Sequence, residues 1–263
     1  MPMASWLVTE APSRFEELAV PEAVKQTLLS TSTSADPPHL MITGPAGVGK
    51  TACWRLFARQ ILGPGWKSTT HILQARDLVR QRGAMATFEE FLRPSGSEKD
   101  TLAGRTSLDA FDRGISISDS EEVAPAGSEG EVKIGTIPIS RLIVIEDADY
   151  LGHIRQAYLR RMMETVGAAS RFVLIARAPS RIIDALRSRS QMIRIPSTGR
   201  EIITTTLSEI AERNGCEPAD GVLADIAYIS DGNLKKAIFT LEMLDIRDLV
   251  SDRSSVHKMV QAS

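Results

Sequence analysis

The chain has 263 residues, of which 43% are hydrophobic and 24% charged, and this ordinary composition excludes a globally disordered protein. Its net charge of −2 excludes a globally basic nucleic-acid-binding protein but leaves room for a local basic patch. At roughly 100–200 residues per domain, the length corresponds to one large domain or two modest ones. Two isolated cysteines and no long apolar run or secretory signal predict a cytoplasmic protein without membrane association, or a nuclear one if the source is eukaryotic.

Short apolar runs alternate with helical patterns as far as Ile195. This alternation is typical of a parallel α/β sheet, whereas the segments that follow have helical spacing with no strand run between them. The sequence therefore predicts an α/β domain and then a small helical domain. The expected strands are 39–43, 71–73, 142–145, 172–175 and 191–195, and the expected helices are 51–62, 155–166, 180–186, 200–214, 221–229 and 234–246.

A composition shift marks an insertion in the α/β domain at about 93–140, where Ser, Gly and acidic residues accumulate. Such a segment buries little apolar surface, so we expect its middle to be flexible. The domain boundary is expected in the Pro- and Gly-containing stretch 196–199. The predicted division is an α/β domain over 1–196, a helical domain over 197–248 and a tail over 249–263.

The motif with the clearest chemistry is Gly44-Pro-Ala-Gly-Val-Gly-Lys-Thr51, which fits the phosphate-binding pattern G-x-x-x-x-G-K-[ST]. A strand pattern precedes it and a helical pattern follows it, as a phosphate cradle requires. Backbone N–H groups of such a loop and the helix N-terminus face the phosphates, while the Lys50 amine adds a positive charge. The Thr51 hydroxyl is expected to bind Mg²⁺.

A second candidate element is the buried strand that ends in Glu146 and Asp147. The carboxyl ends of parallel strands meet at one edge of a sheet, so both carboxylates are expected beside the phosphates. One is expected to hold hydrated Mg²⁺ and the other to orient or deprotonate the attacking water.

Several blocks repeat the order of a known family. RLIVIEDAD, QAYLRRMMETV, RFVLIARAPSRII and LRSRSQMIRI follow one another between residues 141 and 195, and DGNLKKAI comes later in the helical tail. With the phosphate loop, these blocks resemble the AAA+ ATPases and, within them, the small subunits of replication factor C, a sliding-clamp loader. The resemblance covers most of 6–246 and implies a P-loop AAA+ core with a five-stranded parallel sheet, followed by a three-helix lid.

The resemblance implies roles for individual residues. Arg189 corresponds to an arginine finger that reaches the ATP of the adjacent subunit, and Lys235 corresponds to the second sensor. Val20 corresponds to a residue of the adenine pocket. Basic residues of the family contact the DNA backbone at four positions that correspond here to Arg80, Arg82, Arg155 and Arg181. ATP and Mg²⁺ would be bound by Gly44, Pro45, Ala46, Gly47, Val48, Gly49, Lys50 and Thr51, with Glu146 and Asp147 on the metal side.

Three positions depart from the family pattern. The acidic pair reads Glu146-Asp147 instead of Asp-Glu, the first-sensor Asn is Arg177, and the second-sensor Arg is Lys235. A guanidinium has no hydrogen-bond acceptor and cannot position a water by accepting its proton, and Lys lacks the bidentate fork of Arg. Nucleotide binding is thus expected, while hydrolysis is left open. Residues 247–263 are too few for the family's helical collar, so a truncated form and a divergent relative both remain open.

The sequence favours an ATP-binding subunit of a clamp loader in DNA replication. Its expected partners are other clamp-loader subunits, the sliding clamp and the backbone of primer–template DNA. A non-hydrolysing structural subunit that donates Arg189 in trans is the main alternative. Another AAA+ replication-initiation factor is the third possibility.

Overall fold

A computed structural model describes residues 5–93, 124–127, 139–165 and 169–253. Its described residues form a parallel five-stranded sheet in the order β2-β3-β4-β1-β5. The predicted fold class, an α/β core with a five-stranded parallel sheet before a helical region, is confirmed. The strands are β1 (His39–Thr43), β2 (Thr70–Gln74), β3 (Arg141–Glu146), β4 (Ser170–Ala176) and β5 (Ser190–Arg194).

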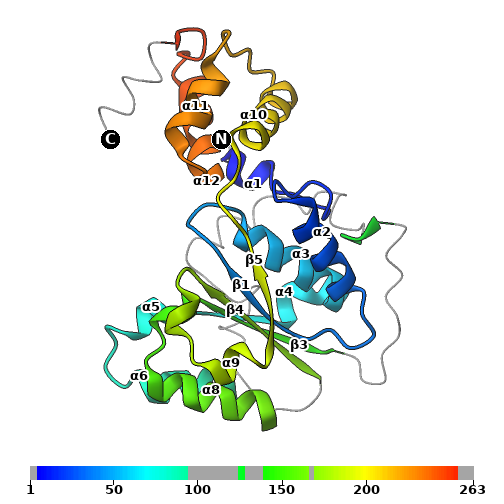
Figure 1. Cartoon of the computed structure of the whole chain (residues 1–263), viewed down its shortest axis with the longest axis vertical. Coiled ribbons are helices and arrows are strands. Elements are labelled where there is room, and N and C mark those ends of the chain that lie inside the picture. Colours follow the sequence, from blue (N-terminus) through cyan, green and yellow to red (C-terminus); the bar gives the residue numbers. More distant parts are fainter. Residues whose placement is uncertain (1–4, 94–123, 128–138, 166–168, 254–263) are drawn as a thin grey trace.

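Helices cover both faces of this sheet (Figure 1). Alternate strand residues serve the two faces: Ile42 and Val144 pack with α2 and α3, whereas Met41 and Ile143 pack with α6 and α8. This double burial explains why the strands read as continuous apolar runs. The helices of this part are α2 (Glu22–Ser32), α3 (Lys50–Leu62), α4 (Trp66–Thr69), α5 (Ala75–Leu78), α6 (Ala84–Leu92), α8 (His153–Thr165) and α9 (Asp184–Arg187), with 3₁₀ turns η1 (Gly63–Gly65), η5 (Ala148–Tyr150) and η6 (Pro179–Arg181).

One predicted helix is divided. The segment 180–186 forms the end of η6 and the start of α9, with extended backbone at Ile182 and Ile183 between them. The side-chain oxygen of Gln156 accepts the N–H of Ile183, and its amide donates to the carbonyl of Arg181. These bonds take the place of helical ones and fix the break.

The helical region has its own core around Ile203, Leu207, Ile226 and Leu241. The N-terminal helix α1 (Trp6–Thr9) joins that core, since Trp6 packs in it and the Glu242 carboxylate accepts the Trp6 N–H at 3.0 Å. The start of the described chain therefore packs on the helical core, while the division into 1–196, 197–248 and 249–263 stays a prediction. The helices are α10 (Arg200–Asn214), α11 (Val222–Ser230) and α12 (Leu234–Ile246).

Most of the predicted flexible insertion lies outside the described residues. Besides its ends at 93 and 139–140, the described part is 124–127, where Pro125 is buried and its carbonyl accepts the N–H of Phe15 at 3.1 Å. The N–H of Ala126 donates to Gln60 on α3 at 2.9 Å. These four residues therefore dock on the core, unlike the flexible stretch that composition predicted.

Within the described part of the chain, no helix is both long and apolar enough to cross a membrane.

Candidate nucleotide-binding site

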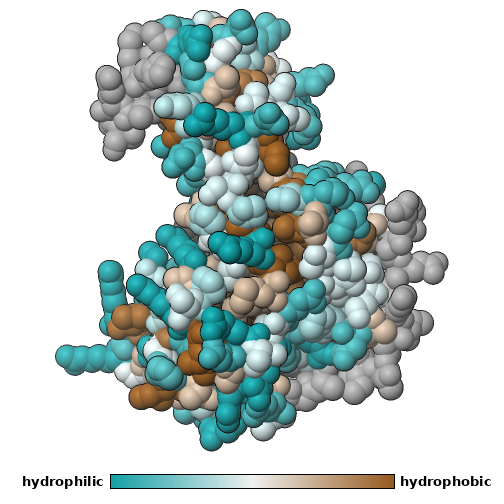
Figure 2. Space-filling model, viewed as in Figure 1, coloured by the Kyte–Doolittle hydropathy of each residue, from teal (hydrophilic) through white to brown (hydrophobic). Residues whose placement is uncertain are grey.

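A cavity of about 1260 Å³ lies where the helical region faces the carboxyl edge of the sheet. Figure 2 shows the molecule narrowing at this junction, with apolar surface on the α/β side just below it. Its walls come from the segment after α1, the loop between β1 and α3, the ends of β3 and β4, and helices α10 and α12. The predicted residues that line it are Val20, Ala46, Gly47, Val48, Gly49, Lys50, Thr51, Glu146, Asp147 and Lys235.

The loop between β1 and α3 has the backbone of a phosphate cradle. Gly44, Gly47 and Gly49 have φ values of 152°, 73° and 92°, a region that residues with a Cβ rarely adopt. Gly49 caps α3, so the unpaired N–H groups of the helix start open toward the cavity. At Gly44, a Cβ would overlap the carbonyl oxygen of Ile195. The glycines of the motif are therefore required by geometry, and the cradle fits a polyphosphate.

Lys50 begins α3 and folds back over this loop. Its amine donates to the carbonyl of Gly44 at 2.8 Å and to that of Pro45. Burial lowers the pKa of Lys50, and the positive charge of Arg177 lowers it further. The Lys50 amine therefore lies at the phosphate loop, and the guanidinium of Arg177 is a second positive charge beside it.

Helix α12 docks directly on the cradle. The backbone N–H of Lys235 donates to the Gly47 carbonyl at 3.0 Å. Asn233 caps α12 by accepting the Lys236 N–H at 2.9 Å, and its side chain fills the space where a Cβ on Gly47 would lie. Asn233 was not among the predicted site residues, although an Asn before a helical pattern is a capping signal.

On the opposite wall, both oxygens of the Glu146 carboxylate already have side-chain partners. The indole N–H of Trp54, a residue only 1% exposed, donates to one oxygen at 3.2 Å. The amide of Gln74, which pairs with Glu146 in the sheet register, donates to the other. A buried indole N–H needs an acceptor, so Glu146 serves the core as well as the cavity. Neither Trp54 nor Gln74 was predicted to touch the site.

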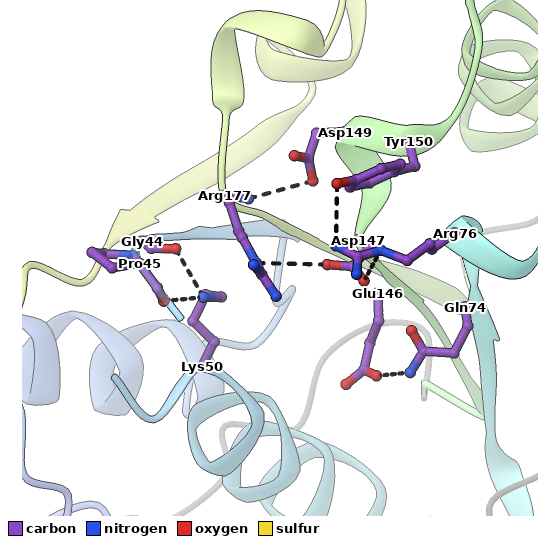
Figure 3. A network of polar contacts seen from close by, with 10 residues as sticks. All are labelled: Gly44, Pro45, Lys50, Gln74, Arg76, Glu146, Asp147, Asp149, Tyr150 and Arg177. Carbon is purple, nitrogen blue, oxygen red and sulfur yellow. Dashed lines mark hydrogen bonds and ion pairs between the residues drawn. The ribbon is translucent and has the colours of Figure 1, made fainter. Parts of the chain in front are cut away.

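Asp147 lies between two arginines. Its backbone is left-handed, with φ 50° and ψ 42°, at the turn from β3 into η5. Its carboxylate faces the Nε atoms of Arg76 at 3.5 Å and of Arg177 at 4.0 Å. Figure 3 shows the Arg177 side chain extending between Lys50 and Asp147, while Glu146 turns away toward Gln74.

The donor set for Mg²⁺ was expected at Thr51, Glu146 and Asp147. Thr51 is exposed in the first turn of α3 and lines the cavity. Mg²⁺ needs free oxygen ligands in near-octahedral geometry, but Glu146 accepts two N–H groups and Asp147 faces two guanidinium groups. The residues present therefore fit a nucleotide phosphate and do not fit a magnesium ion.

Arg189 lies at the opposite edge of the sheet. It precedes β5, whose first residue pairs with His39 at the start of β1, whereas the phosphate loop follows the end of β1. The four-residue offset along the strand amounts to roughly 13 Å, so Arg189 is remote from its own cavity. It is exposed, and its guanidinium pairs with Glu164 on α8.

The arginines predicted to meet DNA lie on neighbouring elements, since α5 packs on η5 and η5 packs on η6. Arg80 and Arg82 are exposed beyond α5, and Arg181 is exposed on η6. Arg155 is half-buried in the first turn of α8, with an Nε atom that lacks a hydrogen-bond partner among the described residues. Their contact with DNA stays a prediction.

Comparison with protein-family models gave no match. Among curated proteins, replication factor C subunit 5 of Schizosaccharomyces pombe is 31% identical over 246 residues, which is 90% of this chain and 64% of that protein. Replication factor C small subunit 1 of Pyrobaculum islandicum is 28% identical over 251 residues, or 95% of this chain and 65% of the relative.

Among solved structures, the RuvB Holliday junction branch migration motor of Thermotoga maritima has a TM-score of 0.62 at 17% identity. That match covers 96% of this chain and 72% of the RuvB chain. Because the identity is low, the match bears on the fold alone. The chain spans slightly less than two thirds of the length of its curated relatives. It has the fold of the AAA+ ATPases, and along nine tenths of its length it resembles the small subunits of replication factor C.

Proposed function

We propose that the chain is an ATP-binding subunit of a sliding-clamp loader that acts in DNA replication. The observation that carries this proposal is the phosphate cradle with its left-handed glycines, closed on one side by α12. The role in a clamp loader is inferred from the names of the curated relatives, which are replication factor C subunits. Other clamp-loader subunits, the clamp and the backbone of primer–template DNA are the proposed partners.

The contact between α12 and the cradle gives ATP a means of controlling subunit shape. Phosphates in the loop would lie beside Gly47, whose carbonyl already binds the N–H of Lys235. The Lys235 side chain lines the same cavity and can neutralise phosphate charge from the lid side. A nucleotide held from both sides would fix the lid against the α/β core and so shape the surface offered to a neighbouring subunit.

A second candidate function is a structural subunit that binds ATP without hydrolysing it and donates Arg189 to its neighbour. The pairing of Glu146 and Asp147 favours it, because each Glu146 oxygen already accepts an N–H group and the charge of Asp147 is opposed by two guanidinium groups. The exposed position of Arg189, remote from its own cavity, suits a finger that acts in trans. An arginine finger is worth about 10³–10⁵ in turnover in related phosphoryl transfers.

Mixed complexes distinguish the two candidates. Lys50→Ala is introduced in this subunit alone, and the total ATPase of the reconstituted complex is measured beside an Arg189→Ala complex. A fall that matches one lost active site in the Lys50→Ala complex would exclude the structural subunit. Turnover that survives Lys50→Ala and drops with Arg189→Ala would exclude hydrolysis by this subunit.

The assignment itself is tested by the mass of complexes recovered with the full chain. We expect other clamp-loader subunits and the clamp. Recovery of origin-binding factors in their place would contradict the proposal and favour a replication-initiation role.

A further inference from the structure

The acidic wall of the cavity carries positive charge where a P-loop site holds its metal ion. Arg177 comes from the end of β4, and its guanidinium lies between the P-loop lysine and Asp147 (Figure 3). Arg76 approaches the same carboxylate from α5, the short helix that follows β2. Both guanidinium groups are permanently charged, and Arg177 lines the cavity together with the phosphate loop.

We propose that Arg177 takes the place of the divalent cation, so that this site binds adenine nucleotide without magnesium. The inference rests on the proposed ATP binding and specifies the form of the ligand. Mg²⁺ bound to ATP neutralises phosphate charge and bridges it to carboxylates. In this cavity Arg177 would neutralise the phosphate charge. Glu146 already accepts two N–H groups, and the charge of Asp147 is already balanced by two guanidinium groups.

The backbone near Arg177 holds its side chain at this place. The Arg177 N–H donates to the buried Asp149 carboxylate at 3.4 Å, and Asp149 follows Asp147 by two residues in η5. The end of β4 is thereby tied to the turn that carries Asp147. A magnesium ion bound at Asp147 would have to displace Arg177 and lie beside a second guanidinium, that of Arg76.

Calorimetric titration of the full chain with ATP, in excess EDTA and in excess MgCl₂, tests the inference. We expect ATP to bind in EDTA with an affinity within about twofold of that in magnesium, or tighter. Arg177→Asn removes the charge and restores a neutral amide; it should weaken binding in EDTA by about tenfold and make binding depend on magnesium. Arg177→Lys keeps the charge and should retain most of the EDTA affinity.

Arg187→Asn is the matched control, because Arg187 is a half-buried arginine that also pairs with an aspartate, Asp184, but lies outside the cavity. Circular dichroism verifies that each variant is folded. If Arg177→Asn fails to fold, the ATP affinities of the wild-type chain in EDTA and in MgCl₂ still test whether the site needs magnesium.

The outcomes separate this inference from the function on which it rests. Binding of wild type only with magnesium would overturn the metal-free site and leave the proposed ATP binding standing. Equal EDTA affinities of wild type and folded Arg177→Asn would overturn the role of Arg177. Absence of ATP binding in both buffers would overturn the proposed function as well.

Discussion

The two walls of the cavity are built from different parts of the polypeptide. The phosphate-loop wall depends on backbone: three glycines with positive φ, a helix start and one amine. The opposite wall depends on the ends of side chains, and there Glu146 and Asp147 bind Trp54, Gln74 and two arginines. The first wall supplies the groups that hold a phosphate, and the second wall adds the charge of Arg177 beside it.

This contrast separates nucleotide binding from hydrolysis. Hydrolysis needs a water and a charge arrangement placed within a fraction of an ångström, which only side chains of the second wall can supply. Substitutions on the first wall should therefore cause the largest losses of ATP affinity, whereas those on the second should mainly change stability and the dependence of binding on magnesium.

The largest effect is expected from Gly47→Ala on the first wall. The residue has φ 73°, and its Cβ would overlap the Asn233 side chain that caps α12. A non-glycine residue in this conformation costs about 1–3 kcal/mol, and loss of the cap about another 1 kcal/mol. We expect ATP affinity to fall on the order of 100-fold in titration calorimetry.

Gly65→Ala is the control for that substitution, since Gly65 has φ −83° and open space around its Cβ position. It should bind ATP like wild type. Unchanged ATP affinity in Gly47→Ala would mean that the lid contact and the loop geometry do not govern binding.

Trp54→Phe and Glu146→Gln probe the second wall. Trp54→Phe removes the indole donor, and Glu146→Gln replaces one of the two carboxylate acceptors with an amide donor. The bonds are part-buried, so the free energy of unfolding should fall by about 1–2 kcal/mol in urea denaturation. ATP affinity should stay within about twofold of wild type. The two changes should be non-additive in a double-mutant cycle because they share one bond. Normal stability of Glu146→Gln with ATP affinity lost only in magnesium would identify Glu146 as a metal ligand.

The backbone-built wall could be predicted from sequence because its signals are local. The spacing of Gly44, Gly49 and Lys50 between a strand pattern and a helix pattern determines the cradle. The strands were predicted for the same reason: buried parallel strands are short apolar runs, and these runs coincide with β1 to β5.

The second wall could not be predicted because its contacts join residues far apart in sequence. Trp54 and Glu146 are 92 positions apart, and Gln74 and Glu146 are 72 apart. Arg177 is visible in the sequence as a departure from the family pattern, but its pairing with Asp147 depends on β4 lying beside β3. The docking of α1 on α12 is likewise a long-range contact, without a local signal.

A smaller effect is expected at the N-cap of α12. Asn233→Ala removes the acceptor for the Lys236 N–H and should lower the free energy of unfolding by about 1 kcal/mol. Asn233→Asp keeps an acceptor at the same place and should be close to wild type in urea denaturation. If both variants match wild type, the cap contributes nothing measurable to the lid, and the lid depends on its apolar core.

The smallest effect concerns the pH dependence of ATP binding. The pKa of Lys50 is lowered by burial and then by Arg177, so the charged amine is lost at a lower pH than for an exposed lysine. ATP affinity, relative to its value at neutral pH, should therefore decline as pH rises through this lowered pKa. In Arg177→Asn the repulsion is removed, the pKa of Lys50 rises, and the decline should move to higher pH. A decline at the same pH in both proteins would show that the charge of Arg177 does not shift the pKa of Lys50. The two walls of the cavity would then be electrostatically independent.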